Sequence, residues 1–319
     1  MRVLIGTITR RRPQGLATLL ESWEELARPT GTELAFAVVE NEPAPSDAAP
    51  VVGAFRARVP EPVHYIVEPE PGIPHARNRV LAIGREIGAR YVLQCDDDQT
   101  VERDWAARLL AAMQSRHLHL AGGPNLFWSR DEGAPARYLV ARSEERAATV
   151  TRRATEGRED AIDVYTNNWC ADLPWLDANG IGFDPALAFT GGSDTALSRA
   201  VRAAGGRIGW VPDAVTREEL PARRCTYGYI YRRARDQVMN SHRFDDGAQR
   251  KNLPSRVPLR AIEAAVVPLL GALRGRNDLP RAAYKLGRAA GTWRYLRGAE
   301  SRHYAPEAAG DHLETAARD

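Results

Sequence analysis

The feature that most constrains the fold is a regular alternation of strand-like and helix-like segments over the first part of the chain. Helix-like segments with apolar residues on one face separate short apolar runs that suit buried strands. These runs lie at residues 2–7, 33–40, 64–67, 91–95 and 118–124. Because consecutive parallel strands need a helical crossover, the alternation predicts a doubly wound, mostly parallel α/β sheet. Sheets of this kind bind ligands at the carboxyl ends of their strands.

The alternation ends after Trp128. Residues 129–160 are charged and weakly periodic, which indicates a mobile loop or a helical insert, and residues 162–166 fit a further strand. Two glycines then precede a helix with Asp194 in its first turn, and a strand at residues 207–211 follows it.

Charge is distributed unevenly along the chain. Residues 1–222 have a balance of −6, residues 223–298 a balance of +12 and residues 299–319 a balance of −3. A block this basic predicts an anionic partner, which is a lipid headgroup, a diphosphate or a nucleic acid. We expect no nucleic acid, because the first part of the chain is net acidic and carries no nucleic-acid-binding motif.

Apolar and aromatic residues interrupt this basic block at residues 259–273 and 282–298. Such a mixture is typical of helices that lie on anionic membranes, and a pair of packing helices is the alternative. We expect no membrane-spanning helix, because no stretch of 18 apolar residues occurs. The first residues resemble a core strand and not a signal peptide. Three widely spaced cysteines argue against a disulfide scaffold or a cysteine zinc site and fit a reducing cytosol.

Three consecutive carboxylates, Asp96, Asp97 and Asp98, directly follow the fourth strand. Two such charges 4 Å apart repel by roughly 1 kcal/mol in water and about 4 kcal/mol at an effective dielectric constant of 20. A divalent cation removes this cost, and hard oxygen ligands suit Mg²⁺ or Mn²⁺, which also bridge phosphate oxygens. A solvated acidic turn is the alternative, but the position at the carboxyl end of a strand favours a site.

Asp194 and Arg77 are further candidates for a site. The glycines before Asp194 let a substrate approach the backbone closely, although Asp194 can also be a helix cap, a role that Ser193 can fill. Arg77 lies in a helix that Pro74 opens, where a surface ion pair is the alternative.

Six segments in order carry a resemblance: VLIGTITRRRP, VVENE, PGIPHARNRVL, VLQCDDDQTVERDW, TGGSDTALSRAVRAAGGRIGWVPDA and EELPARRCTYGYIYRRAR. Together they resemble the family 2 glycosyltransferases of the GT-A fold, and they are particularly similar to bacterial exopolysaccharide enzymes of the succinoglycan type. The resemblance covers about residues 2–243 and is poor at 129–160 and after 250.

The resemblance implies a domain organisation. A Rossmann-like GT-A catalytic domain is expected at residues 1–222, with a nucleotide-sugar half at about 1–128 and an acceptor half at about 161–222. A basic, partly amphipathic helical extension follows at 223–298, and an acidic, flexible tail at 299–319.

The resemblance also implies roles for single residues. Asp194 matches the general base, Asp98 matches a metal ligand, and Glu218 offers a second oxygen ligand. Arg224 falls near the acceptor or the diphosphate. The remaining positions expected around the nucleotide are Thr7, Glu40, Arg77, Asp96 and Asp97.

The activity that the resemblance implies is transfer of a sugar with inversion of configuration. The donor is a nucleotide diphosphate sugar, and a UDP-sugar is favoured because the carboxylate of Glu40 can accept a hydrogen bond from the uracil N–H. The acceptor is a hydroxyl of a glycan or of a polyprenyl-diphosphate-linked sugar, and the cofactor is Mn²⁺ or Mg²⁺. The enzyme is expected in the cytoplasm, peripheral on the inner face of the cell membrane.

Two other functions stay open. A degenerate GT-A binding or scaffold subunit is one, because Arg217 stands where the family often has a metal-binding His and Ser193 where it usually has Glu. A nucleotidyltransferase is the other, but such enzymes carry a Gly-rich phosphate loop after the first strand, and none precedes the basic run Arg10–Arg12.

Overall fold

The computed structural model describes residues 1–245, 250–275 and 277–299. The chain divides into two compact units, each of which is described by itself. The first unit is made of residues 1–126, 143–188 and 193–219, and the second of residues 127–142, 189–192 and 220 onwards.

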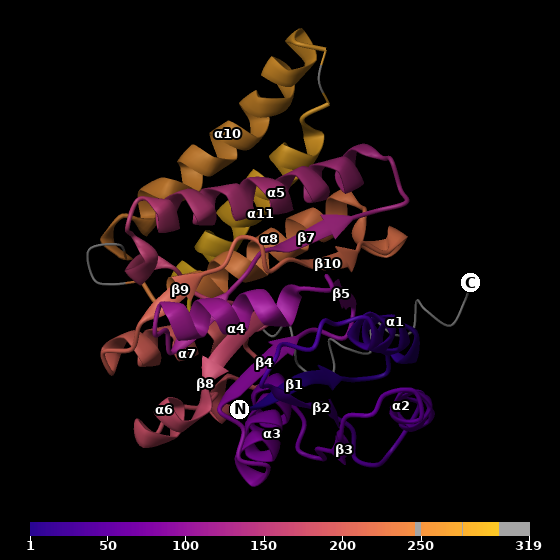
Figure 1. Ribbon diagram of the computed structural model, residues 1–319. Helices are drawn as coiled ribbons and strands as arrows, with labels where there is room; N and C mark the ends of the chain where they lie inside the picture. The colour runs from indigo at the N-terminus through magenta and orange to yellow at the C-terminus, as the bar shows by residue number, and fades with distance from the viewer. Residues whose placement is uncertain (246–249, 276, 300–319) are drawn as a thin grey trace. The chain divides into compact units, whose positions relative to one another are not determined.

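A seven-stranded sheet forms the centre of the first unit (Figure 1). Its strand order is β3-β2-β1-β4-β8-β6-β9. The strands are β1 (Arg2–Thr9), β2 (Glu33–Glu40), β3 (Val63–Val67), β4 (Tyr91–Cys95), β6 (Leu120–Gly122), β8 (Asn168–Asp172) and β9 (Ile208–Trp210). The pairs β1–β2, β2–β3, β1–β4 and β6–β9 are parallel, and β8 runs antiparallel to β4 and β6. The mostly parallel α/β sheet predicted from the sequence is therefore confirmed.

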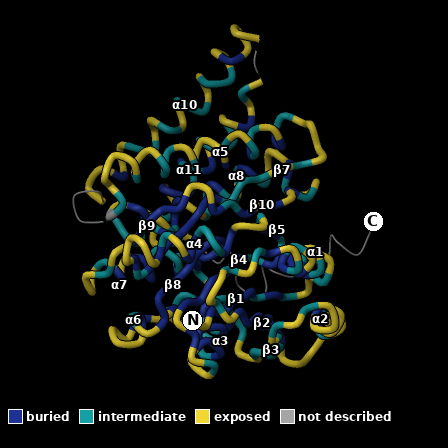
Figure 2. Tube along the Cα trace, viewed as in Figure 1, coloured by how far each residue is buried: buried dark blue, intermediate teal, exposed yellow. Residues whose placement is uncertain are grey.

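Helices cover both faces of this sheet, since side chains alternate between its faces along each strand. Trp23, Phe36 and Phe55 pack together in the apolar cluster on one face, and Leu4, Val80 and Trp169 lie in the cluster on the other. Figure 2 shows the strands buried between them. The helices of this unit include α1 (Pro13–Glu24), α2 (Ala48–Arg56), α3 (Ile73–Glu86), α4 (Trp105–Ser115), α6 (Leu173–Ala178) and α7 (Ser193–Ala203).

A second, three-stranded sheet has the order β5-β10-β7. Its strands are β5 (Gln99–Val101), β7 (Asn125–Trp128) and β10 (Thr216–Glu219). Because β5 follows the acidic triplet directly and pairs antiparallel with β10, Glu218 lies opposite Gln99 in the register.

The second unit is mainly helical and is built on α8 (Tyr227–His242), α10 (Leu253–Leu273) and α11 (Leu279–Leu296). Helices α8 and α11 approach closely at two glycines of α11. A Cβ atom at Gly287 or Gly291 would lie 2.3 Å from the carbonyl oxygen of Tyr231 or Arg235 in α8. No helix in the described residues is long and apolar enough to cross a membrane.

One predicted strand is misplaced, and the helical alternative for residues 129–160 is the one that the structure shows. Residues 162–166 are not a strand; the strand is β8, six residues further on, where Trp169 and Cys170 are fully buried. Residues 129–160 contain a long helix, α5 (Ala134–Thr155), followed by a 3₁₀ helix, η1 (Glu159–Ala161). The expected domain boundary at residue 222 stays a prediction, and the expected flexible tail lies, except for Ala299, outside the described residues.

We expect Gly123→Ala to destabilise the first unit strongly. A Cβ atom there would lie 2.1 Å from the carbonyl oxygen of Ala214 and 2.8 Å from Nδ2 of Asn168. Neither can withdraw cheaply, because Asn168 Nδ2 donates to Ala214 O at 2.7 Å. The loss in the free energy of unfolding should be about 2 kcal/mol or more.

Gly53→Ala is the matched control, because nothing lies within 4 Å of its Cβ position in α2. It should stabilise the fold by about 0.5–1 kcal/mol through helix propensity. Denaturant unfolding of both variants makes the comparison, and equal midpoints would contradict the close contact at Gly123.

Candidate active site

The carboxyl ends of β1 and β4 are tied together by two threonines of β1. Thr7 Oγ1 donates to the carbonyl oxygen of Cys95 at 2.9 Å, and Thr9 Oγ1 donates to Oδ2 of Asp97 at 2.7 Å. Both threonines are buried. Thr7, expected beside the nucleotide, therefore has its hydroxyl engaged in holding the edge of the sheet together.

The three aspartates after β4 differ in their surroundings. Asp97 is buried and accepts from Thr9 and, at 3.1 Å, from Arg12. Asp98 accepts from the same Arg12 Nη1 at 3.0 Å, while the Asp96 carboxylate lies 3.6 Å from Arg77. Arg12 thus bridges two of the three carboxylates, and a search limited to acidic residues misses it.

Partial burial raises the pKa of Asp96 to about 7, against the opposing effect of Arg77, and the charges of Asp98, Asp97 and Asp194 raise it further. Burial also raises the pKa of Asp97, which Arg12 counteracts. The edge of the sheet therefore holds more negative charge than its two guanidinium groups neutralise.

Arg77 connects this acidic cluster to Asp194. It projects from α3, is buried, and donates to Oδ1 of Asp194 at 2.8 Å from the same Nη1 that lies 3.4 Å from Ser193 Oγ. Its guanidinium also lies 5.7 Å from the centre of the Phe183 ring. Arg77 is therefore a buried residue between the carboxylates of Asp96 and Asp194, and the alternative of a surface ion pair is wrong.

Asp194 lies in the first turn of α7, as expected. Thr166 Oγ1 donates to its Oδ1 at 2.7 Å, so both hydrogen bonds that we observe converge on one carboxylate oxygen. Within the described residues, Oδ2 has no hydrogen-bond partner. The geometry leaves a carboxylate with one oxygen held and the other available to an incoming proton.

Glu40 is fully buried at the end of β2. It accepts hydrogen bonds from the backbone and hydroxyl of Ser46 and from the Tyr65 hydroxyl. Burial acts to raise the pKa of Glu40, but these hydrogen bonds outweigh it and lower the pKa below its usual value. In this geometry Glu40 orders the loop after β2, while Glu42, two residues further on, pairs with Arg10 and Arg11.

Glu218 is buried in β10 and accepts from Asn125 Nδ2 at 2.9 Å. Its neighbour Arg217 is half exposed and pairs with Glu102 at 3.1 Å. No group of three or more His, Cys, Asp or Glu within the described ranges is arranged to hold a metal ion.

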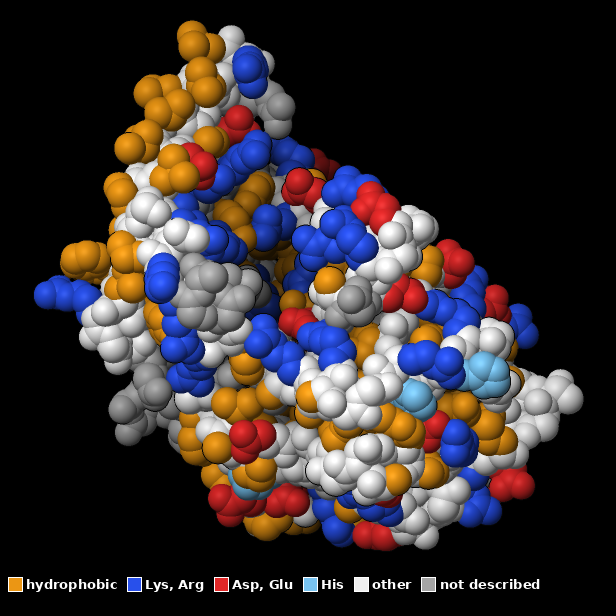
Figure 3. Space-filling model, turned by 90° about the vertical axis from the view of Figure 1, so that its left-hand side faces the viewer, with side chains coloured by type: hydrophobic (Ala, Val, Ile, Leu, Met, Phe, Trp, Pro, Cys, Tyr) orange, Lys and Arg blue, Asp and Glu red, His pale blue; other side chains and the backbone are white. Residues whose placement is uncertain are grey.

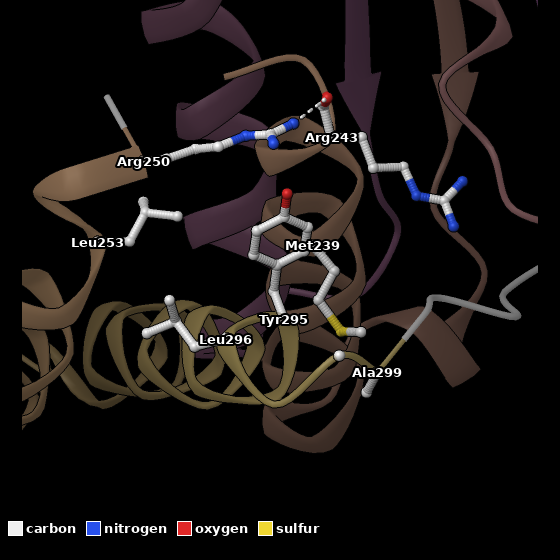
Figure 4. Close-up of a pocket in the computed structure, with 8 residues that line it drawn as sticks. Met239, Arg243, Arg250, Leu253, Tyr295, Leu296 and Ala299 are labelled. Atoms are coloured by element: carbon white, nitrogen blue, oxygen red, sulfur yellow. Dashed lines mark hydrogen bonds between the residues drawn. The ribbon is translucent and has the colours of Figure 1, made fainter. Parts of the chain in front are cut away.

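Arg224 belongs to the second unit, where it ends a short 3₁₀ helix, η3 (Ala222–Arg224). The same unit contains a pocket of about 550 Å³ (Figure 4). Its lining residues are Met239, Arg243, Arg250, Leu253, Tyr295, Leu296, Gly298 and Ala299. No carboxylate is among these described lining residues.

The fold is that of the GT-A glycosyltransferases, as the resemblance implied. Among curated proteins the chain is similar to the succinoglycan biosynthesis protein ExoM of Rhizobium meliloti (strain 1021). The two are 29% identical over 236 residues, which are 73% of this chain and 72% of that protein. The resemblance to succinoglycan-type proteins is thereby confirmed. No protein-family profile matches the chain.

Two solved structures show the same fold. One is the mannosyltransferase PcManGT from Pyrobaculum calidifontis in complex with GDP-Man and Mn²⁺, with a TM-score of 0.65 at 18% identity. The match includes 92% of this chain and 87% of that protein. TarS 1–349 of S. aureus has a TM-score of 0.52 at 14% identity, with 92% of its length covered by 94% of this chain.

The acidic edge generates a prediction for stability. Because the pKa of Asp96 is raised, the folded protein holds a proton that the unfolded chain has already released between about pH 4 and pH 7, so stability should fall as the pH rises through this range. Asp96→Asn should raise the thermal unfolding midpoint at about pH 8 and leave it nearly unchanged at about pH 4.

Asp104→Asn provides the control, because the Asp104 carboxylate is 57% exposed. Differential scanning calorimetry at the two pH values measures the effect. A shift that is the same at both pH values would contradict the raised pKa of Asp96.

Proposed function

We propose that the protein transfers a sugar from a nucleotide diphosphate sugar to an acceptor hydroxyl and inverts the configuration at the anomeric carbon. The observation that carries the proposal is Asp194, held on one oxygen by Arg77 and Thr166 beside the aspartates that follow β4. This combination provides a base and an anionic edge at the carboxyl ends of the strands, where α/β sheets bind their ligands.

The base acts on the acceptor in a single displacement. Asp194 takes the proton of the acceptor hydroxyl on the carboxylate oxygen that has no partner in the described residues. The hydroxyl oxygen forms its bond to the anomeric carbon as the bond from that carbon to the diphosphate breaks on the opposite face. The nucleoside diphosphate leaves with the electron pair, and the configuration inverts.

The acidic edge fits a divalent cation, Mn²⁺ or Mg²⁺. Four carboxylates (Asp96, Asp97, Asp98 and Asp194) face two guanidinium groups (Arg12 and Arg77), which leaves a formal charge of −2 when all are ionised. Asp98, with Glu218 as the second candidate, would hold the ion, and diphosphate and water oxygens would complete its shell. Such an ion supplies electrostatic stabilisation to the leaving diphosphate.

A UDP-sugar is the proposed donor. The proposal comes from the resemblance and from a structural neighbour, TarS 1–349, solved with UDP and with UDP-GlcNAc. PcManGT, by contrast, was solved with GDP-Man. The buried Glu40 adds no support for uridine, because its carboxylate already accepts from Ser46 and Tyr65.

The proposed acceptor is a glycan or a polyprenyl-diphosphate-linked sugar, in keeping with similarity to a succinoglycan biosynthesis protein. Arg224 is proposed to act near this acceptor or the diphosphate. The basic second unit would hold the enzyme on the anionic inner face of the cell membrane, so that enzyme and acceptor share one plane.

Nucleoside diphosphate release from a panel of sugar nucleotides tests the function. Incubation with UDP-, GDP-, CDP- and TDP-sugars and Mn²⁺ should release UDP from one UDP-sugar when acceptor is present, and a chelator should abolish the release. Tight binding of a sugar nucleotide without release from any would favour the scaffold function. Release from a GDP-sugar alone would overturn the choice of uridine and leave glycosyl transfer intact.

We expect Asp194→Asn to lower turnover by about 10² or more with little effect on donor binding, because an amide cannot accept the acceptor proton. Asp177→Asn is the control, since Asp177 also pairs with an arginine, Arg85 at 2.7 Å, but on the exposed surface of α6. Steady-state kinetics and calorimetric donor titration measure the two effects. Near-normal turnover in Asp194→Asn would rule out the role of base.

A further inference from the structure

Helix α10 turns its apolar side outward. Every exposed residue from Pro258 to Leu273 in this fully described stretch is Pro, Ala, Val, Ile or Leu. The six large aliphatic side chains among them are 41% to 84% exposed: Leu259, Ile262, Val266, Leu269, Leu270 and Leu273. Figure 2 shows the exposure along α10, and in Figure 3 hydrophobic side chains gather along the upper left-hand edge, at the height of α10 in Figure 1. We call these six residues the aliphatic edge.

The charged residues of the same stretch turn inward, against α11. Arg260 donates to Thr292 Oγ1 at 2.7 Å, and Glu263 pairs with Lys285. Both charged residues of α10 in this stretch are only partly exposed. The helix pair thus places ion pairs and hydrogen bonds between its members and presents aliphatic side chains to the surroundings.

This arrangement is the reverse of a helix pair stabilised in water. A surface helix in water buries its apolar stripe and exposes its charges. Removing apolar surface from water lowers the free energy, whereas burying a charged group costs its hydration. A contiguous exposed aliphatic face marks a surface that another apolar phase covers. Polar contacts inside and aliphatic side chains outside suit contact with hydrocarbon.

Cations frame the aliphatic edge at both ends. Lys251 and Arg256 precede it, and Arg274 follows it. On α11, exposed Leu279, Leu286 and Trp293 recur every seven residues, so they share one face of the helix. Exposed Arg281 lies between the first two in sequence, and exposed Arg294 and Arg297 follow the third. Aliphatic side chains bordered by Arg, Lys and Trp match the layers of a bilayer surface, from acyl chains to anionic headgroups.

We propose that the aliphatic edge of α10 inserts shallowly into the acyl region of an anionic membrane leaflet, with the flanking cations on the headgroups. The proposal refines the electrostatic docking stated above. Insertion of aliphatic side chains gives an attraction that salt does not screen, whereas docking by charge alone weakens over a Debye length of about 10 Å at 0.1 M salt and 3 Å at 1 M. Its readout is lipid binding, so its failure and a failure of glycosyl transfer are distinguishable.

Flotation with liposomes that contain anionic phospholipid tests the proposal on the full chain. The double variant Ile262→Gln/Leu269→Gln removes two members of the edge and keeps residues with good helix propensity. Ile262→Leu/Leu269→Met is the matched control, because it keeps both side chains apolar. Circular dichroism confirms that each variant is folded.

The wild type and the apolar control should float at about 0.1 M and at about 1 M NaCl. The glutamine variant should bind with an apparent partition coefficient lower by about tenfold or more. Binding that is lost at high salt and is equal in all three proteins would overturn insertion in favour of surface charge alone. Absence of flotation, with a wild type that is dimeric by light scattering and a monomeric glutamine variant, would assign the edge to a second copy of the chain.

Discussion

The acidic edge depends on the ion pairs that the buried guanidinium of Arg77 forms. It lies between Asp96 and Asp194, which come from segments almost a hundred residues apart in the chain. A buried charge without a partner costs several kcal/mol, so the carboxylates and the guanidinium stabilise one another only as a group. The same contact orients Asp194, as its proposed role of general base requires.

Arg12 has the corresponding role on the other side of the triplet. It binds Asp97 and Asp98 from a position just before α1, and Thr9 completes the partners of Asp97. The carboxylate of the middle aspartate is thus held by Thr9 and Arg12, and the outer two aspartates keep partly exposed carboxylates. The two arginines do not fully neutralise the negative charge of the carboxylates at this edge. A divalent cation that also binds a diphosphate would compensate this charge.

The sequence allowed the alternating strands and helices to be predicted because apolar periodicity is local. Strand β8 was not predicted, because its five buried residues include the polar Asn168 and Asp172, which interrupt the apolar pattern of a buried strand. Asn168 is satisfied by Trp105, and Asp172 by Arg90 and the backbone of Trp175, which are contacts that only the folded chain provides. Asp194 and the triplet could be found as candidates from their positions, but Thr166 and Arg12 could not, because hydroxyls and arginines near strand ends are common. The outward apolar side of α10 also could not be predicted from the sequence, because the side of a helix that faces outward depends on the helix it packs against, which is α11 here.

The most direct test of this account is whether Arg77 acts through Asp194. Arg77→Lys keeps the charge but loses the planar fork that reaches two carboxylates. We predict that it lowers turnover by about tenfold or more in the wild-type background and has almost no further effect in Asp194→Asn, as expected for two residues that act as a unit. An equal loss of turnover in both backgrounds would show that Arg77 acts independently of Asp194 and would contradict the account.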